Sequence, residues 1–173
     1  MNLLRDAPLW AQLLLVLLLL AAAAQDIAQR RISNLLCLAV MVLAIIAALV
    51  SGPTIMLWQN VSLFVLLILL SLPAFAAHWV GGGDVKLLAA LGLWADFRAA
   101  PALLACIFIA GGVIAALSLA VRRGRVSAAK GVPYGVAIAV GAAVMLAVPS
   151  FLQPVAPDAG PLDLHAARAA LRP

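Results

Sequence analysis

Apolar residues fill most of the chain in long runs, and short polar or glycine-rich segments separate these runs. The runs cover residues 7–24, 35–50, 55–77 (interrupted by Pro73), 85–95, 99–121 and 132–152. A helix needs about 20 mainly apolar residues to cross a bilayer, and all but the fourth run approach or exceed that length. The pattern therefore predicts an all-α polytopic membrane protein with about six transmembrane helices.

The fourth run, residues 85–95, is short for a bilayer-spanning helix. We expect it either to extend toward Leu103 or to remain half embedded and shielded by its neighbours. Prolines and a glycine mark a polar tail over 154–173, which could hold a short helix over 162–171 but is expected to have little fixed structure. The sequence thus predicts a single membrane-embedded domain over residues 1–153 followed by this tail.

Composition supports a bilayer as the main solvent of the chain. Hydrophobic residues make up 67% of its 173 residues and charged residues 10%, too few to cover a sizeable water-facing domain. The 11 Lys and Arg exceed the 6 acidic residues, which are all Asp, and in a membrane protein this excess indicates cytoplasmic loops and anionic lipid rather than nucleic acid. Cys37 and Cys106 lie in apolar runs without ligand spacing, so the sequence predicts neither a metal site nor a disulfide.

Positive charges predict the orientation of the helices. Arg30 and Arg31 follow the first run, whereas Arg5 before it is offset by Asp6. This flank favours a retained span with its N-terminus outside over a cleaved signal peptide, the alternative that Arg5, the leucines and the alanines at 21–24 raise. Seven Lys and Arg residues fall on the side assigned to the cytoplasm and four on the other, which predicts a multi-pass protein of the inner (cytoplasmic) membrane.

Two aspartates, Asp26 and Asp84, stand out because an ionisable side chain at the edge of a membrane is costly and usually functional. The predicted topology puts both at cytoplasmic ends of helices, although 58 residues separate them in the sequence. If their carboxyl groups approach each other they share one proton, so one can activate water while the other donates a proton to a peptide carbonyl. Taken singly, each could instead be a juxtamembrane charge or a helix-capping residue.

Three successive glycines, Gly81, Gly82 and Gly83, precede Asp84 and predict a loop. Such a run lets the backbone approach a neighbouring helix or an extended substrate closely. No GK[ST] sequence follows it, so a phosphate-binding loop is not indicated. A plain turn is the alternative for this segment.

Three segments together resemble motifs of the prepilin peptidase (type IV leader peptidase) family. Residues 81–94, GGGDVKLLAALGLW, are similar to its GxGD motif region. Residues 26–34, DIAQRRISN, resemble its first motif, an aspartate followed by a basic segment and an Ile-Pro-Asn-like helix start. Residues 132–137, VPYGVA, are similar to its late Pro-aromatic-Gly motif, and the three segments occur in the family's order.

The resemblance implies an aspartic endopeptidase in which Asp26 and Asp84 are catalytic. Gly81 and Gly83 would belong to its active-site loop, and Lys86 would be the basic residue that follows the motif. The implied substrates are prepilin-like membrane precursors, from which the enzyme removes a short basic leader at the cytoplasmic membrane face. No cofactor is implied, and the sequence leaves open whether the chain forms a homo-oligomer.

Two departures from the family pattern qualify these expectations. Ser33 stands where the Ile-Pro-Asn-like pattern has proline, so we expect the helix start there to be less rigidly fixed. The chain has no paired CxxC motifs, which larger relatives carry in a region used for N-methyl transfer, so peptidase activity without N-methyltransferase activity is predicted. In its compact form the chain resembles the small peptidases associated with tight-adherence (Flp) pili.

Two other classes of protein are alternatives. A small ion- or proton-coupled transporter could use the aspartates to bind cations or protons, but such proteins often have matched broken helices in two halves, and only one glycine-broken site is visible here. A non-catalytic assembly factor of a pilus or secretion apparatus would need neither carboxylate.

Overall fold

The computed structural model describes residues 1–52, 57–78, 80–121 and 134–147, and every regular element within them is a helix. In chain order these are α1 (Leu3–Asp6), α2 (Leu9–Gln29), α3 (Asn34–Val50), α4 (Leu57–Ala76), α5 (Gly82–Gly92), α6 (Ala100–Val121) and α7 (Tyr134–Ala147). Among them α2, α4 and α6 are long and apolar enough to cross a membrane, and α3 and α7 are shorter apolar helices. The prediction of an all-α polytopic membrane protein is confirmed.

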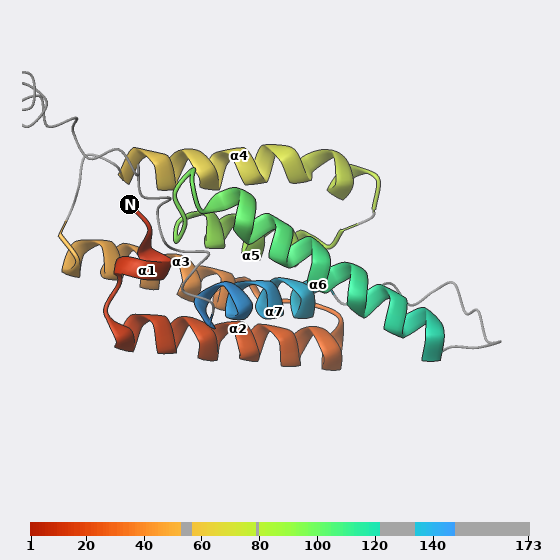
Figure 1. Ribbon diagram of the computed structural model, residues 1–173. Coiled ribbons are helices and arrows are strands. Elements are labelled where there is room, and N and C mark those ends of the chain that lie inside the picture. Colours follow the sequence, from red (N-terminus) through yellow and green to blue (C-terminus); the bar gives the residue numbers. More distant parts are fainter. Residues whose placement is uncertain (53–56, 79, 122–133, 148–173) are drawn as a thin grey trace, which may run out of the picture.

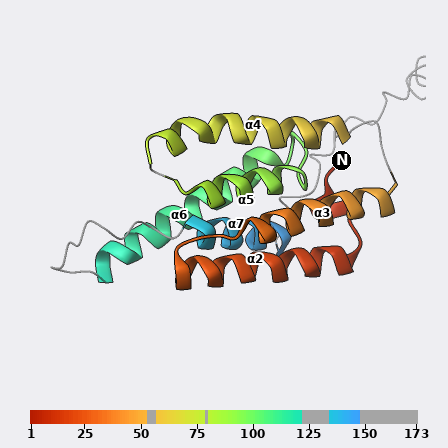
Figure 2. The ribbon, with the colours of Figure 1, turned by 180° about the vertical axis from the view of Figure 1, so that it is seen from behind.

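The helices α2 to α7 run side by side and alternate in direction (Figure 1). Seen from both sides, α4 and α2 form opposite edges of the bundle and the remaining helices lie between them (Figure 2). α7 packs against α2, α5 and α6, while α5 also packs against α3 and α4. Because the directions alternate, the C-terminal end of α2 and the N-terminal ends of α3, α5 and α7 meet at one end of the bundle, at the right of Figure 1. We call this end the aspartate end, and the opposite end, where α1 lies, the α1 end.

The sides of the bundle are apolar and the helices pack closely. Leu17, Leu69 and Phe108 expose 57–72% of their surface, as is typical of helices that face lipid rather than water. Small residues bring helices together inside, since a Cβ on Gly141 of α7 would lie 2.6 Å from the backbone of Ile107 in α6. Such close backbone contact is how helices associate in a bilayer, where hydrophobic burial adds little.

The boundaries of two helices differ from the sequence-based expectations. α2 continues to Gln29, five residues beyond the end of the first apolar run, so Gln25 and Asp26 are still helical. α5 ends at Gly92 and so does not extend toward Leu103, which belongs to the next helix. It is instead shielded by its neighbours, and Leu87 and Leu91 are completely buried.

Three further features refine the picture. The short helix α1 was not predicted, because four residues carry no detectable periodicity. Pro73 does not break the third run but lies inside α4, near its C-terminal end. The predicted tail over 154–173, with its short helix over 162–171, lies outside the described residues.

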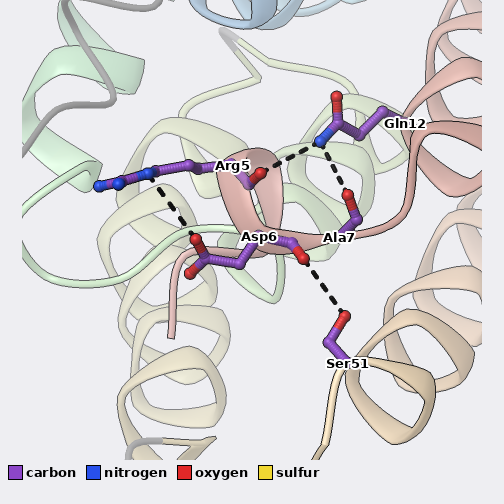
Figure 3. Close-up of polar contacts among 5 residues, drawn as sticks. All are labelled: Arg5, Asp6, Ala7, Gln12 and Ser51. Atoms are coloured by element: carbon purple, nitrogen blue, oxygen red, sulfur yellow. Dashed lines mark hydrogen bonds and ion pairs between the residues drawn. The ribbon is translucent and has the colours of Figure 1, made fainter.

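At the α1 end, side chains bond to main-chain oxygens that the short helix and its connection leave unpaired (Figure 3). The amide of Gln12 donates to the carbonyl of Ala7 at 3.0 Å and to that of Arg5 at 3.3 Å. The Ser51 hydroxyl, just after α3, donates to the carbonyl of Asp6 at 3.5 Å. An exposed ion pair joins Arg5 Nε and Asp6 Oδ1 at 3.8 Å. These contacts tie α1 to α2 and to the end of α3.

The buried amide of Asn60 joins two other segments at the same end. Its Nδ2 lies 2.9 Å from each of three carbonyl oxygens, those of Met1, Leu93 and Ala95. A single side chain on α4 thereby holds the N-terminus and the connection between α5 and α6. The indole of Trp94, also buried, donates to the carbonyl of Val40 at 3.2 Å and ties that connection to α3.

Candidate active site

The sequence pattern put Asp26 just after the first apolar run. In the structure it lies within the last turns of α2, because the helix continues past that run. It is buried, with 6% of its surface exposed. Its Oδ2 accepts a hydrogen bond of 2.9 Å from the main-chain N–H of Gly135, the second residue of α7. The carboxylate therefore points from α2 toward the start of the helix that packs against it.

Asp84 lies in the first turn of α5, and here the predicted glycine loop is wrong. Gly82 and Gly83 are already helical, and Gly81 is the residue that caps the helix. The Oδ2 atom of Asp84 accepts a hydrogen bond of 3.2 Å from the Gly81 N–H, as acidic residues commonly do in the first turn of a helix. The helix-capping alternative thus applies to Asp84, but it does not account for the rest of its surroundings.

The two neighbouring glycines Gly82 and Gly83 are not equivalent. A Cβ on Gly83 would lie 2.9 Å from the Cβ of Ile32, closer than real Cβ atoms come to other atoms, and 3.0 Å from its carbonyl oxygen, which is also tight. A Cβ on Gly82 would meet only the ring of Phe75, at 3.3 Å. Gly83 is therefore the position at which α5 approaches the α2–α3 connection, and it sets where Asp84 stands.

Ile32 links the two aspartates. Besides its contact with Gly83, its side chain packs at Gly135, where an added Cβ would lie 2.8 Å from Ile32 Cδ1 and 2.9 Å from Asp26 Oδ2. Segments that are far apart in the sequence thus converge around one buried isoleucine: the end of α2, the start of α5 and the start of α7. The prediction that both aspartates lie at the same end of the helices agrees with this arrangement (Figure 1).

The electrostatics of the site couple the two carboxyl groups. Asp84 lies outside the three helices long enough to span a membrane. Burial raises the pKa of Asp84 from an ordinary 3.8 to about 6, the negative charge of Asp26 adds to the rise, and the Gly81 N–H opposes it. Asp84 therefore keeps its proton up to a higher pH than an ordinary aspartate does, to about pH 6.

Lys86, the last of the predicted site residues, does not join the aspartates. It is exposed, and its Nζ donates to Asn34 Oδ1 at 2.9 Å, which ties α5 to the first residue of α3. Gly81 is exposed and contributes its N–H to Asp84. The structure thus brings Asp26, Asp84, Gly81 and Gly83 into one region and places Lys86 on its outer side.

The start of α3 next to the site is better fixed than the sequence suggested. The hydroxyl of Ser33 accepts a hydrogen bond from the Leu36 N–H at 3.3 Å and caps the helix. Its own N–H donates to the side-chain oxygen of Gln25, on α2, at 2.7 Å. A proline could provide neither bond, so in this chain two hydrogen bonds hold the helix start where the family pattern has proline.

A mainly apolar cavity of about 430 Å³ adjoins Asp84. Residues of α4, α5, α6 and α7 line it, and its polar side chains are Asp84, Ser71 and Tyr134. Ser71 donates its hydroxyl hydrogen to the carbonyl of Leu67, so this donor is already used within α4 and is not free to bind a group in the cavity. The space is suited to an apolar group that reaches the carboxyl groups from within the membrane.

Sequence reasoning missed two contributors to this site, Gly135 and Gln25. Gly135 lies in the segment 132–137, which resembles a family motif, but the resemblance assigned no role to this residue. Its contact with Asp26 joins residues that are 109 apart in the sequence. Gln25 directly precedes Asp26 and carried no signal of its own. Among the described residues no three His, Cys, Asp or Glu side chains lie together as metal ligands would.

Comparison with known proteins agrees with the motifs. No curated protein and no solved structure gives a significant match. The model of the type IV leader peptidase family matches residues 13–116, more than half of the chain. The matched stretch contains both aspartates and all three glycines before Asp84, but not the segment 132–137. The chain therefore belongs to the type IV leader peptidase family, a family of membrane proteases.

Proposed function

We propose that this protein is an aspartic endopeptidase in which Asp26 and Asp84 cleave the leader from prepilin-like precursors at the cytoplasmic membrane face. The observation that carries the proposal is the convergence of the two carboxyl groups. They lie 58 residues apart in the sequence, and Gly83, next to Asp84, and Gly135, which binds Asp26, both pack against Ile32. The charge of Asp26 also raises the pKa of Asp84. Coupled carboxyl groups of unequal proton affinity are what acid–base hydrolysis of a peptide requires.

The roles of the two residues follow from their surroundings. Asp26, which accepts the Gly135 N–H, is the base that takes a proton from water as the water oxygen attacks the scissile carbonyl carbon. Asp84, with its raised pKa, is the acid that protonates the carbonyl oxygen. When the resulting tetrahedral intermediate collapses, the C–N bond breaks and the leaving amine takes up the proton held by Asp26. A proton from the intermediate returns to Asp84, and the pair is ready for another cycle.

The cavity beside Asp84 supports a membrane-inserted precursor as the substrate. Its apolar walls suit the hydrophobic segment that follows the cleavage point, while the aspartate end presents the scissile bond to the carboxyl groups. Arg30, Arg31 and Lys86 lie at the same end of the helices, which supports a cytoplasmic orientation of this end in a multi-pass inner-membrane protein. The absence of paired CxxC motifs from the chain supports peptidase activity alone, as in the small Flp-type enzymes.

The test is leader removal from a co-reconstituted precursor by Asp26→Asn and Asp84→Asn variants in proteoliposomes. Each should lower the cleavage rate about 10³-fold or more, because each removes one proton-transfer group without changing side-chain size. Asp96→Asn is the matched control, since Asp96 Oδ1 only caps α6 by accepting the Ala99 N–H at 2.8 Å, and an asparagine oxygen can do the same. Undiminished cleavage by the Asp26 and Asp84 variants would refute the proposal, and an Asp84-dependent proton flux would then favour a transporter.

A further inference from the structure

We propose that the main-chain N–H of Gly135 is a positioning group of this active site, which orients the carboxylate of Asp26 as the base. Residue 135 is glycine because any side chain there would occupy the space of that carboxylate. The inference rests on the proposed function, since it assigns a role in the reaction to a third segment of the chain.

The N–H of Gly135 is available because of its place in α7. The helix begins at Tyr134, so Gly135 is in the first turn, where main-chain N–H groups have no acceptor within the helix. Asp26 Oδ2 supplies the acceptor at 2.9 Å in a buried setting. Among the described residues this is the hydrogen bond that the Asp26 side chain makes, so it is the contact that selects one orientation of the carboxylate.

The requirement for glycine follows from the distances around its Cα. A Cβ at position 135 would lie 2.9 Å from Asp26 Oδ2 and 3.1 Å from Asp26 Cβ. It would also lie 2.8 Å from Ile32 Cδ1, but that atom ends a flexible side chain and can turn away. The Asp26 atoms cannot yield without moving the carboxylate, because its Cβ is fixed to the helix.

α7 has a second connection with the reaction. Tyr134 and Ile138, on either side of Gly135 in the helix, line the same cavity as Asp84. The helix that orients the base therefore also forms part of the wall against which the substrate packs. A shift of α7 would change both at once, and the late Pro-aromatic-Gly segment acquires a physical role on this account.

The deciding experiment removes only the N–H. Gly135→glycolate, introduced by nonsense suppression during cell-free synthesis into liposomes, replaces the amide between residues 134 and 135 by an ester and adds no side chain. We expect kcat for precursor cleavage to fall about 10- to 100-fold with KM unchanged. Losses of this size are typical when a hydrogen bond that orients a metal-ligating side chain is removed. A loss of kcat at unchanged KM is the result that a positioning role predicts, because the N–H contacts Asp26 and not the cavity wall.

Gly141→Ala on the same helix is the control for general damage to α7. Its Cβ would lie 2.6 Å from the backbone of Ile107 and would disturb the packing of α6 and α7 without touching Asp26. This variant should lose thermal stability and, because a shift of α7 also moves the cavity wall, raise KM as well as lower kcat, unlike the loss of the N–H alone. A glycolate variant that cleaves like the wild type while Asp26→Asn is inactive would overturn the positioning role and leave the proposed function standing. Cleavage by Asp26→Asn itself would instead remove the proposed function.

The glycine requirement has its own pair of variants. Gly135→Ala should lose activity, and adding Ile32→Val, which removes the Cδ1 atom, should not restore it, because the clash with Asp26 remains. Full recovery in the double variant would show that Ile32 rather than Asp26 forbids a side chain at position 135. That outcome would overturn the steric part of the inference.

Discussion

The two ends of the bundle each bury a polar side chain, but they satisfy it in different ways. At the α1 end the amide of Asn60 faces three carbonyl oxygens, all at 2.9 Å, and carries no charge. At the aspartate end the carboxylate of Asp26 accepts one main-chain N–H, and its charge raises the pKa of a second carboxyl group, that of Asp84. The buried polar group of the α1 end joins segments of the chain, whereas the aspartate end holds two acidic groups that interact electrostatically.

The difference separates a structural site from a reactive one. A neutral amide can be buried at moderate cost in free energy. The α1 end tolerates this cost, since the side-chain oxygens of Asn2 and Asn60 have no partner among the described residues. Two nearby carboxyl groups destabilise the fold unless one is protonated, so their retention indicates a task other than stability. Substitutions at the α1 end should therefore change stability with little effect on cleavage, and those at the aspartate end should do the reverse.

The largest effect that we expect beyond the aspartates themselves comes from Gly83→Ala. The added Cβ would meet the Cβ and the backbone of Ile32, so the first turn of α5 must shift and Asp84 must shift with it. A displacement of about 1 Å commonly costs about 10²-fold in rate, and we expect a loss of that size in kcat for leader removal. Gly82→Ala is the matched control, because its Cβ meets only the movable ring of Phe75 and should leave at least about half of the rate. Equal losses in the two variants would contradict the special role of Gly83.

At the α1 end, Asn60→Leu should destabilise the fold by about 2–3 kcal/mol. The similar-sized leucine leaves three carbonyl oxygens without the amide donor, and each unpaired buried polar group costs about 1–3 kcal/mol, partly relieved by relaxation. Thermal or denaturant unfolding in detergent micelles would measure the loss. Cleavage per folded molecule should stay within about twofold of the wild type below the unfolding temperature. A kcat that falls while stability is unchanged would mean that this end also takes part in the reaction.

The pH dependence of cleavage should report Asp84. Because its pKa is raised to about 6, the protonated form needed for an acid persists to that pH and is lost above it. The rate should therefore fall about tenfold for each pH unit above about 6, as ionisation of one essential acid requires. Stability has the same sign: the folded state binds this proton more tightly than the unfolded state, so stability declines as pH rises from about 4 to about 6. Asp84→Asn should abolish this decline, whereas Asp96→Asn should retain it.

Sequence patterns accounted for the helices and for the end at which the aspartates lie. Each apolar run corresponds to a helix, although only three of these helices are long enough to span a membrane. Short connections make neighbouring helices alternate in direction, so Asp26 and Asp84 fall at one end. The pattern could not show that Gly82 and Gly83 are helical. Glycine has a low helix propensity, and here the close approach to Ile32 outweighs it. This is a tertiary effect that no local pattern records.

The missed contacts have the same origin. The Gly135 bond to Asp26 joins residues 109 apart, and the Asn60 amide reaches carbonyls that lie 33, 35 and 59 residues away. Only the packing of α7 on α2, and of α4 on α5, brings these groups together. A polar residue in an apolar run could be recognised as costly from the sequence, but its partner could not.

The smallest effect that we expect lies at Ser33, beside the aspartates but made of neutral hydrogen bonds like those of the α1 end. Ser33→Ala removes the hydroxyl that accepts the Leu36 N–H and caps α3, and should cost about 1 kcal/mol of stability. Ser33→Pro removes in addition the N–H that binds Gln25, but proline fits the observed φ of −71° and restricts the unfolded chain, which offsets about 0.4–1 kcal/mol. Both variants should cleave within about twofold of the wild type.

A double-mutant cycle isolates the Gln25 bond from the cap. Gln25→Ala should cost about 1 kcal/mol in the wild type and almost nothing in the Ser33→Pro background, where the N–H partner is already gone. Unfolding of the four proteins in one detergent measures the coupling. Additive losses would mean that the 2.7 Å contact contributes no stability, and a large loss of kcat would mean that the start of α3 positions Asp26. Coupling in stability without a change in kcat would show that neutral hydrogen bonds act structurally even next to the reacting carboxyl groups.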